Sequence, residues 1–536
     1  MTALLTADEV RKAEKAAIDA GVSESELMAR AATGIAEMIH QESMIASRAV
    51  VLAGPGNNGG DGIVIATKLI ELGWDVALWC WNRPETGDLP CDQESLGQVS
   101  SIKAVDDLRE ALSEADVVID AVFGAGGRAE LPDEVANAFE AVRMANQQRY
   151  IQVWAVDLPS GVSSEDGSVA EGALEADVTA MVGLPKLGAY KLPAASFTGE
   201  IEFVEIGLAE PEGIPPERER LITAQRARQS IPTRRTGVHK RSAGTLLVIG
   251  GAPNYYGAPR LTGEAALRSG AGLVSIAAPS SIIGSIATAV PELTYVPLPV
   301  SEHSSAAGRM VKIVRDNWSI ADAVAIGPGL GTDAPVPDFL AQLLGFDRGL
   351  RTGIGFGTHD EPDPVEPFSG KAVIDADGLN WLAGQDEWWT TLSDSELVLT
   401  PHPGELSRLL GANRSEIESD PWSHARSAAK RFGQVVVLKF AHTVVALPNG
   451  ELWVAHQAPP GLATAGTGDV LTGVIGSLLA QGCSTADAAI AGVRIALEAA
   501  MECAASEGST GYLASDIIEQ LPAARELVSR SRAGIR

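Results

Sequence analysis

The stretch AVVLAGPGNNGGDG (residues 49–62) indicates how the first part of the chain folds. Its five apolar residues have the length of a buried strand. A glycine-rich turn then leads into an amphipathic segment from about Asp61 to Leu72, with Gly73 at its end. Glycines at such a turn let the backbone approach a ligand closely, and the helix N-terminus offers unpaired N–H groups to an anion. The spacing matches neither the P-loop nor the dinucleotide fingerprint. We therefore expect a strand, a turn and a helix with a ligand site at the turn; a plain tight turn is the alternative.

The same alternation of apolar runs and helix-length segments continues along the chain. Further strands of the first series are expected at residues 75–80, 116–122, 151–157, 177–182 and 201–206. After a proline-rich connection at 209–237, a second series is expected at 245–249, 273–278, 323–326, 372–374, 397–399 and 435–438. Pro448-Asn449-Gly450 predicts a hairpin between 444–447 and 452–455, and residues 345–370 are interpreted as a surface insertion. The pattern predicts an α/β protein of two domains, residues 1–220 and 221–536, each with a mostly parallel sheet between helices.

Composition narrows the range of partners. The chain has 536 residues and a formal net charge of −28. This charge argues against a nucleic-acid partner, because phosphate binding needs a basic surface, and an anionic ligand has to be held by local groups such as backbone N–H. The charged N-terminus leaves no room for a signal peptide, and no apolar run is long enough to span a bilayer. We therefore expect a cytoplasmic protein with no membrane partner. The four cysteines lack the spacing of a zinc site.

Polar side chains follow two further expected strands of the first domain. Asp120 lies near the end of one strand, and Asp157 and Ser160 follow the next. Because the carboxyl ends of parallel strands meet at one edge of a sheet, these residues are expected near Asn58 in the glycine-rich turn. Oxygen ligands from Asn58, Asp120 and Ser160 suit a hard cation with loose geometry. Each aspartate taken alone is better explained by turn capping, but together they predict a site.

A second glycine-rich loop, residues 464–469, precedes an apolar helix expected from about Val470. Glycines at a helix N-terminus favour anion binding, whereas the carboxylate of Asp469 repels phosphate. We interpret Asp469 as a general base toward a hydroxyl that attacks a terminal phosphoryl group; helix capping is the alternative. The motifs at 250–259, 327–331, 375–380 and 400–405 also follow apolar runs, so they are expected at the same edge of the second sheet.

The first half resembles the NAD(P)H-hydrate epimerase family over roughly residues 5–208. The resemblance rests on GPGNNGGDG, on DAVFG (120–124), on VDLPSG (156–161) and on PKLG (185–188). It implies a Rossmann-like three-layer domain with potassium at Asn58, Asp120 and Ser160. It also implies a substrate site formed by Asn57, Asn58, Gly59, Gly60, Asp61, Gly124, Ala125, Gly126, Gly127, Arg128, Ala129, Glu130 and Asp157. Inverting the C6 carbon of the hydrated nicotinamide needs a proton donor and acceptor, and Asp157 is the expected acid–base residue.

From about residue 228 onward the chain resembles the ADP- or ATP-dependent NAD(P)H-hydrate dehydratases, a branch of the ribokinase-like α/β/α fold. The resemblance implies substrate contacts at Ala258, Gly329, His402 and Asp469. It implies contacts to the adenine nucleotide at Lys439, Phe440, Ala441, His442, Thr443 and Gly468. Phe440 and Ala465 stand where the family usually has glycine.

Together the two resemblances imply a bifunctional repair enzyme for NADHX and NADPHX, the hydrated forms of NADH and NADPH. Its second domain would phosphorylate the C6 hydroxyl of the S epimer with ADP or ATP and Mg²⁺ and then expel phosphate. Its first domain would convert the R epimer to the S epimer, and a homo-oligomer is expected. The rival interpretation is a ribokinase-like kinase for a vitamin precursor, with a first domain that binds a ligand without catalysis. Absorbance at 340 nm separates the two, because only repair restores the dihydronicotinamide.

Overall fold

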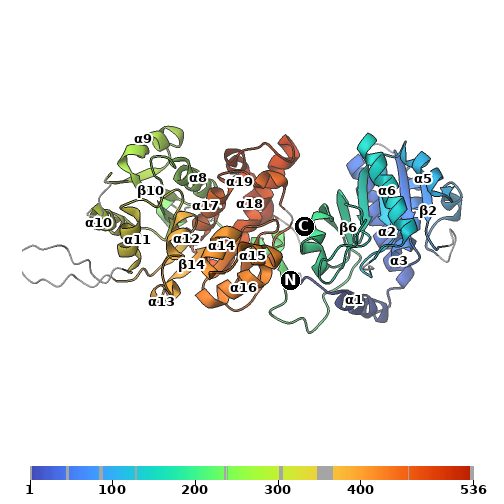
Figure 1. Ribbon diagram of the computed structural model, residues 1–536, viewed down its shortest axis with the longest axis horizontal. Helices are drawn as coiled ribbons and strands as arrows, with labels where there is room; N and C mark the ends of the chain where they lie inside the picture. The colour runs from blue at the N-terminus through green and yellow to red at the C-terminus, as the bar shows by residue number, and fades with distance from the viewer. Residues whose placement is uncertain are drawn as a thin grey trace, which may run out of the picture. The chain divides into compact units, whose positions relative to one another are not determined.

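The computed structural model describes residues 3–43, 47–83, 89–126, 130–234, 237, 239–300, 306–346, 366–456 and 458–530. The chain forms two compact units, Met1–Leu221 and Ile222–Ile535, each with helices packed around one sheet (Figure 1). The predicted α/β class is confirmed in both. No helix in the described ranges combines the length and the apolar character that crossing a membrane requires.

The sheet of the first unit has seven parallel strands in the order β3-β2-β1-β4-β5-β6-β7. The strands are β1 (Arg48–Ala53), β2 (Asp75–Cys80), β3 (Ser100–Ile102), β4 (Val117–Ala121), β5 (Gln152–Val156), β6 (Val178–Val182) and β7 (Glu200–Val204). Successive side chains of a strand point to opposite faces, so the sheet carries two apolar clusters. One contains Val51 with α2 (Glu24–Ser43) and α3 (Asn57–Glu71); the other contains Val50 with α5 (Val105–Leu112) and α6 (Asp133–Gln148). The unit is therefore a three-layer sandwich.

The strand order reverses at β1, which lies between β2 and β4. Open α/β sheets bind ligands at such a reversal, beyond the carboxyl ends of the strands. The glycine-rich turn follows β1 at this place, but α3 begins at Asn57 and not near Asp61 as the sequence suggested. Glycine is required within this first turn, because a Cβ at Gly59 would lie 1.9 Å from the carbonyl oxygen of Gly54. The three-residue edge strand β3 was not predicted, and it lacks the length that marks a strand in a sequence.

The second unit has a ten-stranded sheet in the order β11-β10-β9-β12-β13-β14-β15-β16-β17-β8. Its strands are β9 (Thr245–Ile249), β10 (Leu273–Pro279), β11 (Thr294–Leu298), β12 (Ala323–Ile326), β13 (Lys371–Ile374), β14 (Glu396–Leu399), β15 (Val435–Leu438), β16 (Val444–Ala446) and β17 (Leu452–Val454). The last strand in the order, β8 (Arg220–Leu221), falls at the boundary between the two units. Pairing is parallel from β11 to β15, and β15, β16 and β17 pair antiparallel, so the predicted hairpin is confirmed. The edge strand β11 and the short β8 were not predicted.

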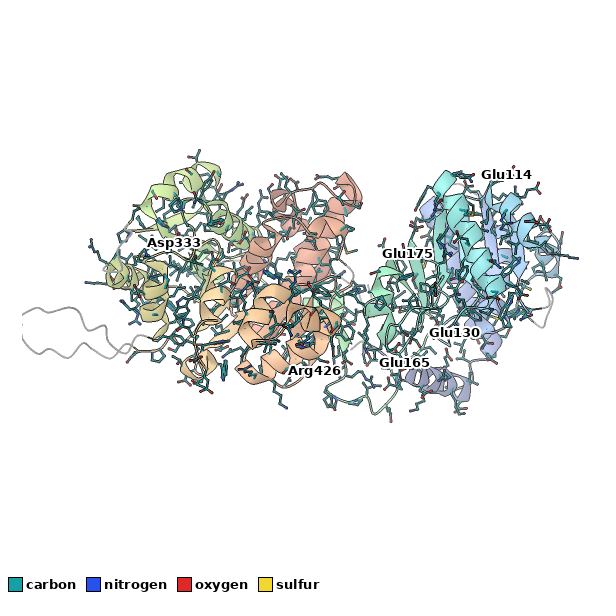
Figure 2. The ribbon with its side chains drawn as sticks, in the orientation of Figure 1. Glu114, Glu130, Glu165, Glu175, Asp333 and Arg426 are labelled. Atoms are coloured by element: carbon teal, nitrogen blue, oxygen red, sulfur yellow. The ribbon has the colours of Figure 1, made fainter. Side chains whose placement is uncertain are left out.

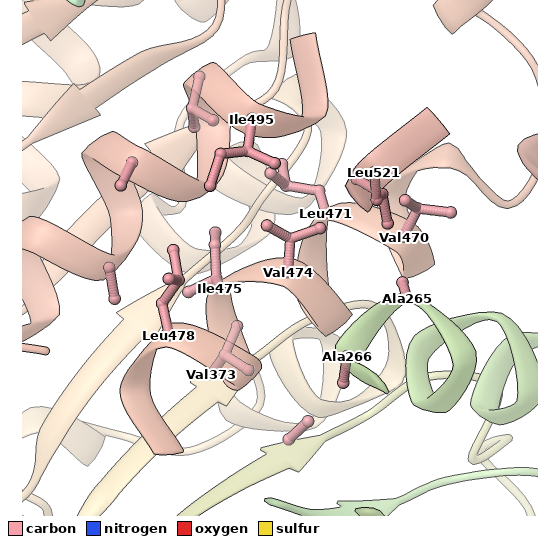
Figure 3. Close-up of a cluster of buried hydrophobic side chains, with 14 of the residues drawn as sticks. Ala265, Ala266, Val373, Val470, Leu471, Val474, Ile475, Leu478, Ile495 and Leu521 are labelled. Atoms are coloured by element: carbon pink, nitrogen blue, oxygen red, sulfur yellow. The ribbon is translucent and has the colours of Figure 1, made fainter. Parts of the chain in front are cut away.

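The core of the second unit centres on α17 (Thr467–Ala480), which is buried at every position from residue 470 to 480. Val474 and Ile475 of α17 lie among side chains of α8 (Gly257–Arg268), β13, α18 (Thr485–Glu507) and α19 (Ala514–Arg530), as Figure 3 shows. A helix that is apolar on all sides needs partners all round, and these elements supply them. At the α8 contact a Cβ on Gly473 would lie 2.2 Å from the carbonyl oxygen of Thr262, so the two helices meet at backbone distance.

This contact makes Gly473 a sensitive test of the core. Gly473→Ala is expected to lower the free energy of unfolding of the second unit by about 1–3 kcal/mol, because α8 or α17 must move. Gly284→Ala, on α9 (Ser280–Ala289), is the matched control: nothing lies within 4 Å of its Cβ position. That change is expected to be neutral or to stabilise by about 0.5–1 kcal/mol. Calorimetric unfolding of the full chain measures both, and equal midpoints for the two variants would contradict the packing described.

Candidate functional site

The first candidate site lies beyond the carboxyl ends of β1, β4 and β5. Its backbone is tightly packed, since a Cβ at Gly54 would lie 2.0 Å from the carbonyl oxygen of Val122. The guanidinium of Arg83, after β2, donates to the carbonyl oxygens of Gly54 and Gly56 and fixes the turn. The first turn of α3 therefore has little freedom beside the ends of β4 and β5.

Asp157 directly follows β5 and has a φ of 67°, which is unusual for a residue with a side chain. Its Oδ2 accepts from the backbone N–H of Ala125 at 3.1 Å, and its Oδ1 accepts from that of Val182 at 3.3 Å. Its Oδ1 also forms an ion pair with the Nζ of Lys186, whose side chain is 2% exposed. The strained backbone thus presents a carboxylate that a buried cation holds in one orientation.

Two pairs of predicted residues are in contact or close by: Ser160 bonds to Asp120, and Asn58 approaches Asp157 at Gly124. The Ser160 backbone N–H donates to Asp120 Oδ2 at 2.8 Å, and its Oγ donates to Oδ1 at 2.6 Å. Burial raises the pKa of Asp120 to about 6, although these hydrogen bonds act in the opposite direction. A Cβ at Gly124 would lie 2.9 Å from Asn58 Oδ1 and 3.3 Å from Asp157 Oδ2. Gly124 therefore lies between the two side chains, and a larger residue there would push them apart.

The remaining residues predicted for this site are spread more widely. The Asn57 amide donates to Glu24 of α2 at 3.3 Å, and Gly59 and Gly60 are buried in α3. Asp61 is half-buried, and burial raises its pKa well above the ordinary value, with a further contribution from Asp157. The other predicted residues lie on the adjoining loop: Ala125 is half-buried, Gly126 and Glu130 are exposed (Figure 2), and Gly127, Arg128 and Ala129 lie outside the described residues.

The second candidate site lies beyond the carboxyl ends of β9, β12, β13 and β15, where the strand order again reverses. The Nζ of Lys439, after β15, donates to Asp375 Oδ1 at 2.6 Å, and the Thr472 hydroxyl donates to Oδ2 at 2.8 Å. A Cβ at Gly468 would lie 3.3 Å from the Lys439 Nζ. This places the ammonium beside the first turn of α17, where backbone N–H groups favour an anion.

Asp469 lies within the first turn of α17, since the helix begins at Thr467 and not near Val470 as expected. The N-cap is Gly466, with no side-chain capping bond, so Asp469 does not cap the helix. Burial raises the pKa of Asp469 to about 7, with contributions from Asp375 and Asp377 and an opposing one from Lys439. Its carboxyl has no hydrogen-bond partner among the residues the structure describes, which leaves it available to a ligand.

His402 begins α14 (Pro403–Leu410) and caps it. Its Nδ1 accepts from the backbone N–H of Gly404 at 3.0 Å, and its own N–H donates to Glu405 Oε2 at 2.8 Å. Burial, with help from Lys439, lowers the pKa of His402, and burial raises that of Glu405 to about 7. Because Nδ1 accepts from Gly404, the proton of the neutral imidazole lies on Nε2.

The structure brings Ala258 and Gly329 together, because a Cβ at Gly329 would lie 3.0 Å from the Cβ of Ala258. The segment after Lys439 is more mixed: Phe440 and Thr443 are half-buried and Ala441 is exposed. His442 is buried, with Nδ1 at 3.1 Å from the carbonyl oxygen of Ala455, and burial lowers its pKa to about 4. Its ring is thus turned to the protein interior.

Sequence reasoning gave no role to four groups that the structure places in these sites: Lys186, Glu14, Asp375 and Thr472. Lys186 and Asp375 stand in motifs that were noticed, PKLG and DADGLN, and a charged residue in an otherwise apolar or glycine-rich motif was the available signal. Glu14 and Thr472 stand in ordinary helical sequence. Only the fold shows that they approach the other groups.

Comparisons with known proteins match both units. The family described as NAD(P)H-hydrate dehydratase matches residues 246–523, and the family described as YjeF-related protein N-terminus matches residues 24–188. A curated relative, the bifunctional NAD(P)H-hydrate repair enzyme Nnr of Moorella thermoacetica, is 34% identical over 92% of this chain and 91% of its own length. The Escherichia coli enzyme of the same name is 33% identical over 96% and 92%. A solved structure, the Bacillus subtilis ADP/ATP-dependent NAD(P)H-hydrate dehydratase, is 25% identical over 57% of this chain and 98% of its own, with a TM-score of 0.44.

The pair of Lys439 and Asp375 allows a test of the second site that needs no ligand. Their side chains are 22% and 3% exposed. Lys439→Met is expected to lower the free energy of unfolding by about 3 kcal/mol, because it leaves a buried carboxylate without its cation. Adding Asp375→Asn removes that charge and is expected to recover most of the loss. Urea unfolding of the full chain measures both variants, and a double variant no more stable than Lys439→Met would contradict the prediction.

Proposed function

The chain belongs to the bifunctional NAD(P)H-hydrate repair enzymes, and we propose that its first unit epimerises the hydrated nucleotides and its second unit dehydrates them at the expense of ADP or ATP. Similarity to relatives of that name extends over both units, at 34% identity and 92% of the chain. The structural observation that carries the proposal is a carboxylate at the carboxyl edge of each sheet, in an ion pair with a buried or half-buried lysine and close to the first turn of a helix.

In the first unit the substrate is a hemiaminal, with a hydroxyl on the ring carbon C6 next to N1. Asp157 accepts the proton of that hydroxyl, and the carbon–nitrogen bond opens as the carbonyl forms. Rotation and closure on the other face give the opposite epimer. Lys186 supports this role because its ion pair fixes the orientation of the Asp157 carboxylate, whose Oδ2 also accepts from the N–H of Ala125.

The predicted potassium site of the first unit fits the residues present. Asn58, Asp120 and Ser160 supply oxygen atoms of the kind a loosely coordinated hard cation takes. Asp120 is buried without a cationic side chain in contact among the described residues, and Asn58 Nδ2 is buried without a hydrogen-bond partner there. Because amide oxygen and nitrogen are assigned from their partners, an unpartnered atom at this place suits an oxygen that faces a cation. Bound potassium would balance the Asp120 carboxylate and anchor the ligand's negative charge.

In the second unit Asp469 is the general base. It takes the proton of the C6 hydroxyl as that oxygen attacks the terminal phosphorus of ATP or ADP, and ADP or AMP leaves. The N1 lone pair then expels phosphate from C6, and loss of a proton from C5 restores the dihydronicotinamide. A base with a pKa of about 7 suits proton removal at neutral pH.

The nucleotide is placed by Lys439 and the first turn of α17. The ammonium beside Gly468 and the free N–H groups of the helix attract the terminal phosphates, which the chain's overall negative charge repels. No group of three His, Cys, Asp or Glu side chains in the described parts of the chain is arranged to hold a metal. We therefore expect Mg²⁺ to bind together with the nucleotide, whose phosphates commonly serve as ligands of this ion. The ion would neutralise part of the phosphate charge.

Racemic hydrated NADH with ATP tests both assignments in one assay. The wild type is expected to restore absorbance at 340 nm in a fast phase from the S half and a second phase limited by epimerisation of the R half. Asp157→Asn is expected to keep the fast phase and slow the second by a factor of about 10²–10⁴ toward the spontaneous rate. Asp469→Asn is expected to lose the fast phase as well. If the protein instead consumed ATP in the presence of a vitamin precursor and did not restore absorbance at 340 nm from hydrated NADH, it would be a kinase.

The pH dependence of the second unit follows from its base. Asp469 has to be ionised to act, and its pKa is about 7, so kcat for the S epimer is expected to fall as the pH drops through 7. Glu405 has a similar pKa and is the necessary control. Glu405→Gln is expected to keep the acid limb of the kcat profile, measured with purified S epimer and saturating ATP. Loss of the limb in that variant would assign it to Glu405.

A further inference from the structure

The first site contains two carboxyls for which the proposed epimerisation has no stated use, Asp61 on α3 and Glu14 on α1 (Ala7–Asp19). Both are half-buried, and neither has a hydrogen-bond partner among the residues the structure describes. Half-buried carboxyls in a ligand site without protein donors are available to a ligand. The segment before α1 bonds to both neighbours of Lys186, and Asn58 at the start of α3 lies close to Asp157 at Gly124.

Asp61 is placed by its position on α3. It lies three residues after Asn58, so both side chains are on the same face of the helix. The Asn58 Oδ1 lies 2.9 Å from the Cβ position of Gly124, and Asp157 Oδ2 lies 3.3 Å from the same point. The face of α3 that carries Asp61 is therefore the face directed at Asp157.

Glu14 is placed by the segment before α1. Ala3, Leu4 and Leu5 are fully buried, and Leu5 pairs on both sides of Lys186: its N–H donates to Pro185 at 2.9 Å, and its carbonyl accepts from Leu187 at 2.8 Å. The Glu165 carboxylate accepts from the N–H of Ala7 at 2.8 Å at the start of the helix. These bonds fix the start of α1 to the loop that carries Lys186. Glu14 lies one helical turn after the buried Val10 and is itself half-buried, so it is on the packed side of α1.

We propose that Asp61 is the general acid of the epimerisation, acting opposite Asp157 as the general base, and that Glu14 is a positioning residue for Asp61. The inference rests on the proposed epimerase function and assigns the proton donor it requires. Asp157 takes the hydroxyl proton, the C6–N1 electron pair passes to N1, and Asp61 protonates N1. On closure N1 attacks the other face of the aldehyde and returns its proton to Asp61, while Asp157 returns its proton to the oxygen. No atom is gained or lost over the cycle.

The charges around the two carboxylates give them these different roles. Asp61 faces Asp157 from β5, Glu14 from α1 and Arg83 after β2; burial and the two carboxylates raise its pKa, and Arg83 opposes them. Glu14 faces Lys186, Asp157, Arg11 and Glu24, and burial raises its pKa. Asp157 instead has Lys186 in contact. One site thus holds a carboxyl in an ion pair with a lysine and, beside it, a carboxyl whose protonated form is favoured by burial, an arrangement that suits an acid–base pair.

The racemic assay with the full chain tests the donor. Asp61→Asn keeps an amide of the same shape that cannot deliver a proton, and its second phase is expected to slow by a factor of about 10²–10⁴ while the fast phase is unchanged. An unchanged second phase would overturn the assignment. If the wild type itself showed no second phase above the spontaneous rate, the epimerase function would fail, which is a different result. Asp19→Asn, on the exposed end of α1, is the control and should match the wild type.

Glu14 is tested by a pH profile, which a purely structural role would not move. A general acid has to be protonated, so the second-phase rate falls as the pH rises through the pKa of Asp61. Removing the neighbouring negative charge with Glu14→Gln is expected to shift this descending limb to lower pH, with the maximal rate retained within about threefold. Glu14→Asp is expected to restore the wild-type limb. A uniform loss of rate with the limb in place would overturn the role given to Glu14.

Discussion

In both units a helix or loop lies against the carboxyl edge of the sheet at a distance that only glycine permits. A Cβ at Gly59 would lie 1.9 Å from the Gly54 carbonyl oxygen, and one at Gly327 would lie 1.8 Å from that of Asp375. The first contact holds the N-terminus of α3 at the reversal between β1 and β4; the second holds the turn after β12 against the segment that carries Asp375. Without these approaches the polar side chains at the strand ends would lie too far apart to act on one ligand. These contacts explain why glycine occurs in these helices and turns, although it loses more backbone entropy on folding than other residues do.

Close packing also excludes water, and the exclusion of water shifts the pKa values of the carboxyls in both sites. Burial raises the pKa of Asp120 to about 6 and that of Asp469 to about 7, because an ionised carboxyl is poorly stabilised there. The Lys186 and Lys439 side chains offset this where they touch a carboxylate directly. In a chain with a net charge of −28, these two buried cations are also local attractions for an anionic nucleotide. The same lysines thus orient the aspartates and favour the ligand.

The strand positions could be predicted from the sequence because each is a short apolar run bounded by turn residues. Most expected strands agree with the structure to within one or two residues, as for Thr245–Ile249 and Val435–Leu438. The helix starts were wrong at both glycine-rich loops, because glycine disfavours a helix locally. In the structure Gly59 and Gly468 lie in the first turns of α3 and α17, in close contact with Gly54 and Lys439 respectively. The edge strands β3 and β11 have too weak a pattern. Site residues in conspicuous motifs were found, whereas Glu14 and Thr472 reach their sites from helices whose sequences give no sign of it.

The two sites contain similar groups, an aspartate and a lysine, but the proposed reactions require different proton transfers. In the second, the phosphoryl-transfer step removes one proton, from the C6 hydroxyl, and a single carboxyl with a pKa of about 7 can accept it. In the first, a ring bond has to open and close without any net transfer, so a donor and an acceptor have to exchange protons with the same substrate. A lone carboxylate fixed by Lys186 does not meet that need. The Asp61 carboxyl of α3 supplies the missing donor, and Glu14 of α1 acts on Asp61. Residues 3–5 are buried and bond to both neighbours of Lys186, so the N-terminal segment is part of the structure that holds this site.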